Sequence, residues 1–123
     1  MALVEYLMRQ AKLCLANAER EFCEGHSPAV PGYMLYAIFN AVQAVQALDD
    51  RDYNYMTVSL SMFMANYIET GIFPERFSGI IDAAFTVSCN MWTELFPQFQ
   101  TVREFLAEAE AYIENRRTAK GHW

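Results

Sequence analysis

Residues 33–48 read YMLYAIFNAVQAVQAL, a stretch without a single acidic or basic side chain. A helix that is apolar on nearly all sides is normally surrounded by other helices. The stretch is too short for a membrane span, because Pro31 precedes it and Asp49 closes it. It therefore predicts the central helix of a helical bundle.

Four further helices are predicted around this segment from apolar residues that recur at three- and four-residue steps. The expected segments are 2–23, 56–70, one opened by Pro74 and Glu75, and one opened by Thr101. Gly25 and Gly71 stand where helices usually stop. Thr101 and Glu104 have the spacing of a capping box. We expect an all-α, up-and-down bundle of about five helices.

The buried faces of the flanking helices follow from the same spacing. The expected apolar stripe of the first helix includes Val4, Met8, Ala11, Ala18 and Phe22. That of the fourth helix consists of Phe77, Ile80, Ile81, Ala84, Phe85, Ser88 and Trp92. The turn that starts at Asp49 carries four charged residues in a row and is expected to be solvated.

The length of 123 residues fits one domain with a buried core. We assign that domain to residues 1–117 and expect 118–123 to be a flexible tail, because the last residues lack an apolar repeat. The net charge of −6 disfavours partners that are recognised by clustered Lys and Arg, namely nucleic acids and anionic membrane surfaces.

The cysteines indicate the compartment and argue against a metal centre. Their number is three, which is odd, and no signal peptide is recognisable, so a cytoplasmic location is expected. No pair has the spacing of metal ligands, and buried structural thiols are expected instead. Neither a metal nor another cofactor is predicted.

Polar residues on otherwise apolar helix faces are the candidate site residues. They are Tyr36, Asn40, Gln43, Ser88, Asn90 and Trp92. Buried amides need partners, so one interpretation is a core hydrogen-bond network that fixes helix register. The other is a groove between the second and fourth helices, lined by Tyr36, Asn40, Ser88 and Asn90. With Trp92, such a groove would form a stacking and hydrogen-bonding pocket.

Common catalytic patterns are absent from the sequence. His26 and His122 have no neighbours that suggest a triad, and no glycine-rich phosphate loop occurs. The pairs Glu104 with Glu108 and Glu110 with Glu114 lie on the polar side of the last helix, where a solvated face is expected.

Residues 36–41, YAIFNA, resemble the YAxFHA pattern on the second helix of HEPN domains. Residues 58–60 (VSL) and 67–74 (YIETGIFP) are similar to the third helix and the following turn of that family. Residues 83–85 (AAF) look like its RAF segment, and a last helix rich in Glu and Ala also fits. The resemblance covers residues 3–116 and depends on the order and spacing of these motifs.

The resemblance implies a helical bundle that pairs into a homodimer through its central helices. Many HEPN members are ribonucleases of toxin–antitoxin, CRISPR-associated or abortive-infection systems, and many are encoded beside a small nucleotidyltransferase. Other members are non-catalytic binding or scaffolding domains. A nucleotidyltransferase-like protein is therefore an expected partner.

The sequence departs from the catalytic pattern of that family. Catalytic members carry an Arg and, a few residues later, a His on the fourth helix, but no Arg lies between Arg76 and Arg103 here. Ser88 stands near the Arg position, and Asn40 stands where many members have His. Without the cation and the imidazole, nothing evident stabilises phosphate charge or moves the 2′-hydroxyl proton.

We therefore expect a catalytically silent HEPN-like bundle that acts as a dimeric binding or regulatory module. The uncharged, Met-rich surface of the second and third helices is the expected interface. The alternatives are a ribonuclease with replaced residues or a phosphotransfer partner, and a bundle that binds a nucleotide or another small molecule.

Overall fold

The computed structural model describes residues 2–89 and 98–121, and all regular structure within them is helical. The helices are α1 (Ala2–Cys23), α2 (Val30–Leu48), α3 (Met56–Phe63), α4 (Ser78–Cys89) and α5 (Phe99–Gly121). Short 3-10 helices precede α2 (η1, Ser27–Ala29) and α4 (η3, Glu75–Phe77), and a π-helix (η2, Met64–Ile68) continues α3. The predicted all-α bundle of five helices is confirmed.

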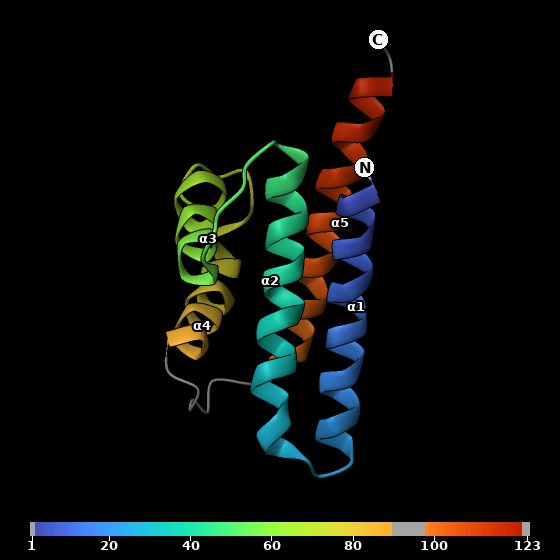
Figure 1. The fold of residues 1–123 in the computed structure, drawn as a ribbon, viewed down its shortest axis with the longest axis vertical. Coiled ribbons are helices and arrows are strands. Elements are labelled where there is room, and N and C mark those ends of the chain that lie inside the picture. The colour runs from blue at the N-terminus through green and yellow to red at the C-terminus, as the bar shows by residue number, and fades with distance from the viewer. Residues whose placement is uncertain (1, 90–97, 122–123) are drawn as a thin grey trace.

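Helix α2 occupies the middle of the bundle, as predicted. In Figure 1 it lies between α1 and α5 on one side and α3 and α4 on the other, and it contacts all four of them. A broad side of the helix is fully enclosed, as shown by Met34, Ala37, Ile38, Ala41, Val42, Ala44 and Val45, whereas Tyr36 on the other side is 50% exposed. The helix begins at Val30 rather than Tyr33, so Pro31 stands in its first turn, where the missing N–H is harmless.

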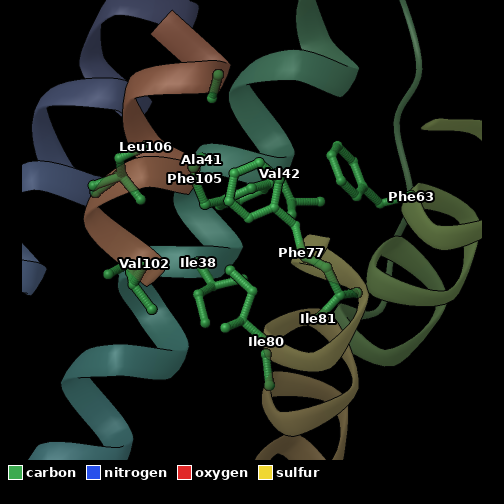
Figure 2. Close-up of a cluster of buried hydrophobic side chains, with 14 of the residues drawn as sticks. Ile38, Ala41, Val42, Phe63, Phe77, Ile80, Ile81, Val102, Phe105 and Leu106 are labelled. Atoms are coloured by element: carbon green, nitrogen blue, oxygen red, sulfur yellow. The ribbon is translucent and has the colours of Figure 1, made fainter. Parts of the chain in front are cut away.

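The core is formed by apolar side chains from all five α-helices and the short segments between them. Figure 2 shows Ile38, Ala41, Val42, Phe63, Phe77, Ile80, Ile81, Val102, Phe105 and Leu106 packed against one another. The Phe105 ring of α5 lies 5.4 Å from the Phe77 ring and 5.7 Å from the Phe63 ring, centroid to centroid. Burial of each such side chain stabilises the fold by roughly 1.5–3 kcal/mol.

Two glycines end helices at the predicted positions. Gly25 has a φ of 80° and Gly71 a φ of 81°, in the left-handed region that favours glycine. After α1, the His26 amide donates to the Glu21 carbonyl at 2.8 Å, which closes the last turn of the helix.

The predicted start of the last helix was wrong. Helix α5 begins at Phe99, and the Val102 amide already donates to the Gln98 carbonyl at 3.1 Å, so Thr101 lies inside the first turn. Glu104 does not close a capping box, because its carboxylate accepts from Arg76 at 3.2 Å. Helical backbone also continues to Gly121, into the segment that was expected to be a tail.

Two aromatic residues from the expected apolar stripes are exposed. Phe22 is 46% exposed because it lies in the last turn of α1, beyond the last buried residue of that helix, and Phe85 is 36% exposed at the edge of the buried arc of α4. The Phe22 ring packs edge-on against Phe99, with 5.4 Å between centroids, whereas Phe85 lies at the rim of a surface cavity.

Ion pairs connect α1 and α5 at seven-residue steps. Glu5 pairs with Arg117, Lys12 with Glu110, and Glu19 with Arg103, so the two helices run antiparallel. Exposed pairs of this kind contribute about 0–1 kcal/mol each, so they specify the register of the two helices more than they stabilise the fold.

Within the described ranges, no helix combines the length and the hydropathy that a membrane span requires.

Candidate functional site

The candidate residues of α2 face α1 rather than α4. Asn40 is half-buried, and its Nδ2 lies 3.9 Å from the Cys14 sulfur of α1, a weak hydrogen bond. Gln43, one turn further along, lines a cavity that α1 also lines. Tyr36 is 50% exposed. These three residues therefore follow one side of α2, next to α1.

The candidate residues of α4 are not brought together with those of α2. The Ser88 hydroxyl donates to the Phe85 carbonyl of its own helix at 2.6 Å. Where α2 and α4 meet, Figure 2 shows Ile38 and Val42 packed in one apolar cluster with Ile80 and Ile81. Asn90 and Trp92 lie outside the described residues. The contact between α2 and α4 in the described ranges is therefore apolar core.

The main polar cluster of the core is centred on Asp49, directly after α2. The hydroxyls of Tyr67 and Tyr112 each donate to its Oδ2 at 2.6 Å. The Arg116 Nη2 atom lies 2.8 Å from its Oδ1. The Asp49 side chain is only 13% exposed, so the expectation of a solvated turn was wrong at this residue. It is buried because η2 and α5 supply the donors that compensate for its lost hydration.

The environment of the cluster keeps both phenols protonated. Burial, followed by the hydrogen bond to Asp49, raises the pKa of Tyr67 well above its ordinary value. The same two causes raise the pKa of Tyr112 to about 12. Both protonated phenols donate to Oδ2 of the carboxylate, whereas Oδ1 faces Arg116 in an ion pair and accepts no hydrogen bond among the described residues. This arrangement suits a structural link between elements.

The π-helix η2 places Tyr67 in this cluster. The Glu69 amide donates to the Met64 carbonyl at 2.9 Å, a bond across five residues that marks the π-turn. The Phe73 amide then donates to the Tyr67 carbonyl at 2.8 Å, so the chain folds back over the end of η2. Tyr67 is thereby almost completely buried, with its hydroxyl directed to Asp49.

A second polar pair joins α2 to α3. The Ser59 hydroxyl donates to Gln46 Oε1 at 2.7 Å, and Gln46 Nε2 donates to the Ser59 carbonyl at 2.8 Å. Both residues are at least 98% buried, and each polar atom of the Gln46 amide has one partner. The expected core amide network therefore exists, but Gln46 forms it and not Asn40 or Gln43.

Sequence reasoning did not find Asp49, Gln46 and Ser59 as partners, although one signal was present. Tyrosines on apolar helix faces need a partner for the hydroxyl when they are buried. Tyr67 and Tyr112 both stand on such faces, and Asp49 closes the most apolar helix of the chain. An acceptor for both hydroxyls could have been sought there.

One group of potential metal ligands occurs in the part of the chain that the structure describes. Glu21, Glu24 and His26 bring their ligand atoms within 4.8 Å of one another at the end of α1. His26 Nδ1 lies 2.7 Å from Glu21 Oε2, and His26 is exposed, as predicted. A surface ion pair accounts for this arrangement, and no metal centre is assigned to it.

The cysteines differ in their environments. Cys14 is half-buried beside Asn40, and burial raises the pKa of its thiol, partly offset by the Asn40 hydrogen bond. Cys23 is exposed at the end of α1, so the expectation of a buried thiol was wrong there.

The paired carboxylates of α5 include two that form ion pairs: Glu104 contacts Arg76, and Glu110 contacts Lys12.

Neither a family model nor a curated protein matches this chain.

Proposed function

We propose that this chain is a non-catalytic helical bundle of the HEPN type, which pairs with a second copy and serves as a binding or regulatory module. The single observation that carries the proposal is the outer surface of α3 and α4, two helices whose one charged residue is Asp82. The resemblance in sequence adds the family and a nucleotidyltransferase-like protein as the further partner.

Charged residues are distributed unevenly over the bundle. Neither α3 nor η2 contains one, and α4 contains Asp82 alone, whereas α1 and α5 carry many. Since α2 is enclosed, it offers little surface, and the interface expected on the second and third helices moves to α3 and α4. Figure 1 shows these two helices together at one edge of the bundle.

We define the α3–α4 face by four residues, which are Val58, Ser61, Met64 and Phe85. Val58 is 43% exposed and Phe85 36% exposed. Ser61, Met64 and Phe85 line a surface cavity of about 220 Å³, with Asp82 at its edge. The face thus combines exposed apolar side chains with a shallow hollow into which a side chain of a partner can pack.

A second copy of this chain fits the α3–α4 face better than a partner recognised by charge. Two molecules of net charge −6 repel each other unless their contact keeps the charged residues apart. A two-fold dimer brings the same patch of both copies together, so the uncharged residues of the α3–α4 face meet each other, with Asp82 at the edge of the contact. The charges on α1 and α5 then remain on the outside.

The catalytic alternative finds no support in the described contacts. The Ser88 hydroxyl bonds to its own helix, and Asn40 is paired with Cys14. The Asp49 carboxylate is occupied by two phenols and Arg116. A ribonuclease needs a group that moves the 2′-hydroxyl proton and a second group that stabilises the phosphate charge. The side chains of Ser88, Asn40 and Asp49 instead take part in contacts within the fold.

The test is the oligomeric state of designed variants, measured by native mass spectrometry and light scattering at tens of micromolar protein. Wild type is expected to be a dimer. Val58→Glu and Phe85→Glu place like charges opposite each other across the two-fold axis, so both are expected to be monomers. Leu13→Glu is the matched control, because Leu13 is 52% exposed on α1 and lies outside the face.

A wild-type monomer, or a dimer that survives both glutamate variants, contradicts the proposed face. Cleavage of RNA by the wild-type protein, absent in Ser88→Ala and Asn40→Ala, contradicts the non-catalytic function.

A further inference from the structure

A polar cavity of about 190 Å³ lies where four segments of the chain meet. Leu3 and Leu7 of α1 and Ala47 of α2 form its apolar side. Gln46 and Ser59 form its floor and satisfy each other by hydrogen bonds. The connection between α2 and α3 forms the rim with Arg51, Asp52 and Tyr53.

Three polar side chains that line this cavity have donors or acceptors left for a ligand. Within the described part of the chain, the Gln43 side chain makes no hydrogen bond and Asp52 takes part in no ion pair. Arg51 takes part in no ion pair there either; its guanidinium is hydrogen-bonded to the side chains of Tyr53 and Tyr67, and its other N–H groups remain available. The Arg51 guanidinium lies over the Tyr67 ring, 5.8 Å from its centroid, which holds the cation at the rim. The cavity therefore presents a cation, a carboxylate and an amide beside an apolar wall.

We propose that this cavity binds a small zwitterion, an α-amino acid with a short apolar side chain. The ligand's carboxylate accepts hydrogen bonds from the Arg51 guanidinium, whose planar fork matches a carboxylate. Its ammonium group donates to the Asp52 carboxylate and to Gln43 Oε1. Its side chain lies against Leu3 and Leu7. The proposal does not rest on the proposed function, since none of these residues belongs to the α3–α4 face.

The size of the cavity limits the ligand. A water molecule occupies about 30 Å³ in the liquid, so the cavity holds roughly six waters or one organic molecule with a similar number of non-hydrogen atoms. Alanine and valine are of this size, whereas a nucleotide is several times larger. The adjacent opposite charges of Arg51 and Asp52 favour a zwitterion over a simple anion. An anion bound to Arg51 would place its negative charge next to the Asp52 carboxylate and would offer that carboxylate no cation.

Calorimetric titration with three related ligands tests this assignment. The ligands are L-valine, its amide, which lacks the carboxylate, and 3-methylbutanoate, which lacks the ammonium group. Valine is expected to bind, and each analogue to bind roughly 10-fold more weakly or worse, because each loses one charged hydrogen-bond partner. Binding of 3-methylbutanoate as tight as that of valine, or no binding of valine, overturns the proposal.

Two cavity variants and two matched controls complete the experiment. Arg51→Gln and Asp52→Asn are both expected to weaken valine binding by about 10-fold or more. Both residues are exposed, so circular dichroism should show an intact fold. Arg76→Gln and Asp82→Asn make the same changes on η3 and α4, away from the cavity, and should bind like wild type. Unchanged binding in both cavity variants overturns the assignment, whatever the oligomeric state.

Discussion

The Asp49 carboxylate shows how one side chain can join three elements. It follows the last residue of α2, accepts from Tyr67 of η2 and Tyr112 of α5, and faces Arg116. A buried carboxylate costs free energy unless donors replace its water, and here two hydroxyls and a guanidinium do so. Its role is therefore to connect α2 to two segments that are distant in sequence.

Asp49→Asn should destabilise the protein by about 1–3 kcal/mol, because the shape is kept while the charge that binds two hydroxyls and Arg116 is lost. Urea unfolding measures the change. Asp50→Asn is the matched control: Asp50 is exposed, with a φ of 58° that Asn tolerates, so a change below about 0.5 kcal/mol is expected there. Equal effects of the two substitutions would contradict the role of Asp49.

The stability of the protein should fall at high pH through Tyr112. Its pKa is about 12 in the fold against an ordinary value of 10, so the folded state favours the protonated phenol. A raised pKa contributes stability that is fully present below pH 10 and is lost as the pH rises toward 12. Tyr112→Phe cannot ionise, so the difference in unfolding midpoint between wild type and Tyr112→Phe should shrink over this range. A difference that stays constant with pH would refute this.

Between α2 and α3, a polar pair stands in the middle of the contact. Gln46 and Ser59 exchange two hydrogen bonds in an otherwise apolar interface. Buried polar pairs of this kind specify register, because a shift of either helix would leave both groups without partners. The π-turn of η2 then continues the chain so that Tyr67 reaches Asp49.

Ser59→Ala should cost about 1–3 kcal/mol, since Gln46 Oε1 is left buried without a donor. The double variant Gln46→Leu/Ser59→Ala should cost less than the sum of the two single changes, because it removes both partners together. Thermal or urea unfolding of the four proteins of this cycle measures the coupling. Ser61→Ala, on the exposed side of α3, should have almost no effect. Additive changes would mean that the pair is not coupled.

For the molecule as a whole, the separation of charge is the property with functional consequences. The helices α1 and α5 carry ion pairs at regular steps, while the α3–α4 face has none. The proposed dimer is a prediction from this distribution of charge. The oligomeric states of Val58→Glu and of its control Leu13→Glu test the prediction. Because the amino-acid cavity lies at the connection between α2 and α3, dimer formation and ligand binding can be tested separately.

Local sequence patterns sufficed for the helices and for the choice of the central one. The absence of charge from residues 33–48 predicted a central helix packed against several others, and α2 is central, with one partly exposed side that includes Tyr36. Apolar spacing predicted the buried faces of α1, α4 and α5, except for Phe22 in the last turn of α1 and Phe85 at the edge of the buried face of α4, which are exposed. Hydrophobic burial acts on each helix separately, and its period is visible in the sequence.

Tertiary structure alone decided which polar groups meet. Asp49 was expected in solvent, and it is buried because Tyr67, Tyr112 and Arg116 approach from distant parts of the chain. The amide that is hydrogen-bonded in the core belongs to Gln46 and not to Asn40, because Ser59 of α3 faces Gln46. A hydrogen bond depends on distances of a few tenths of an ångström between atoms of different elements, and no periodicity along one helix encodes them.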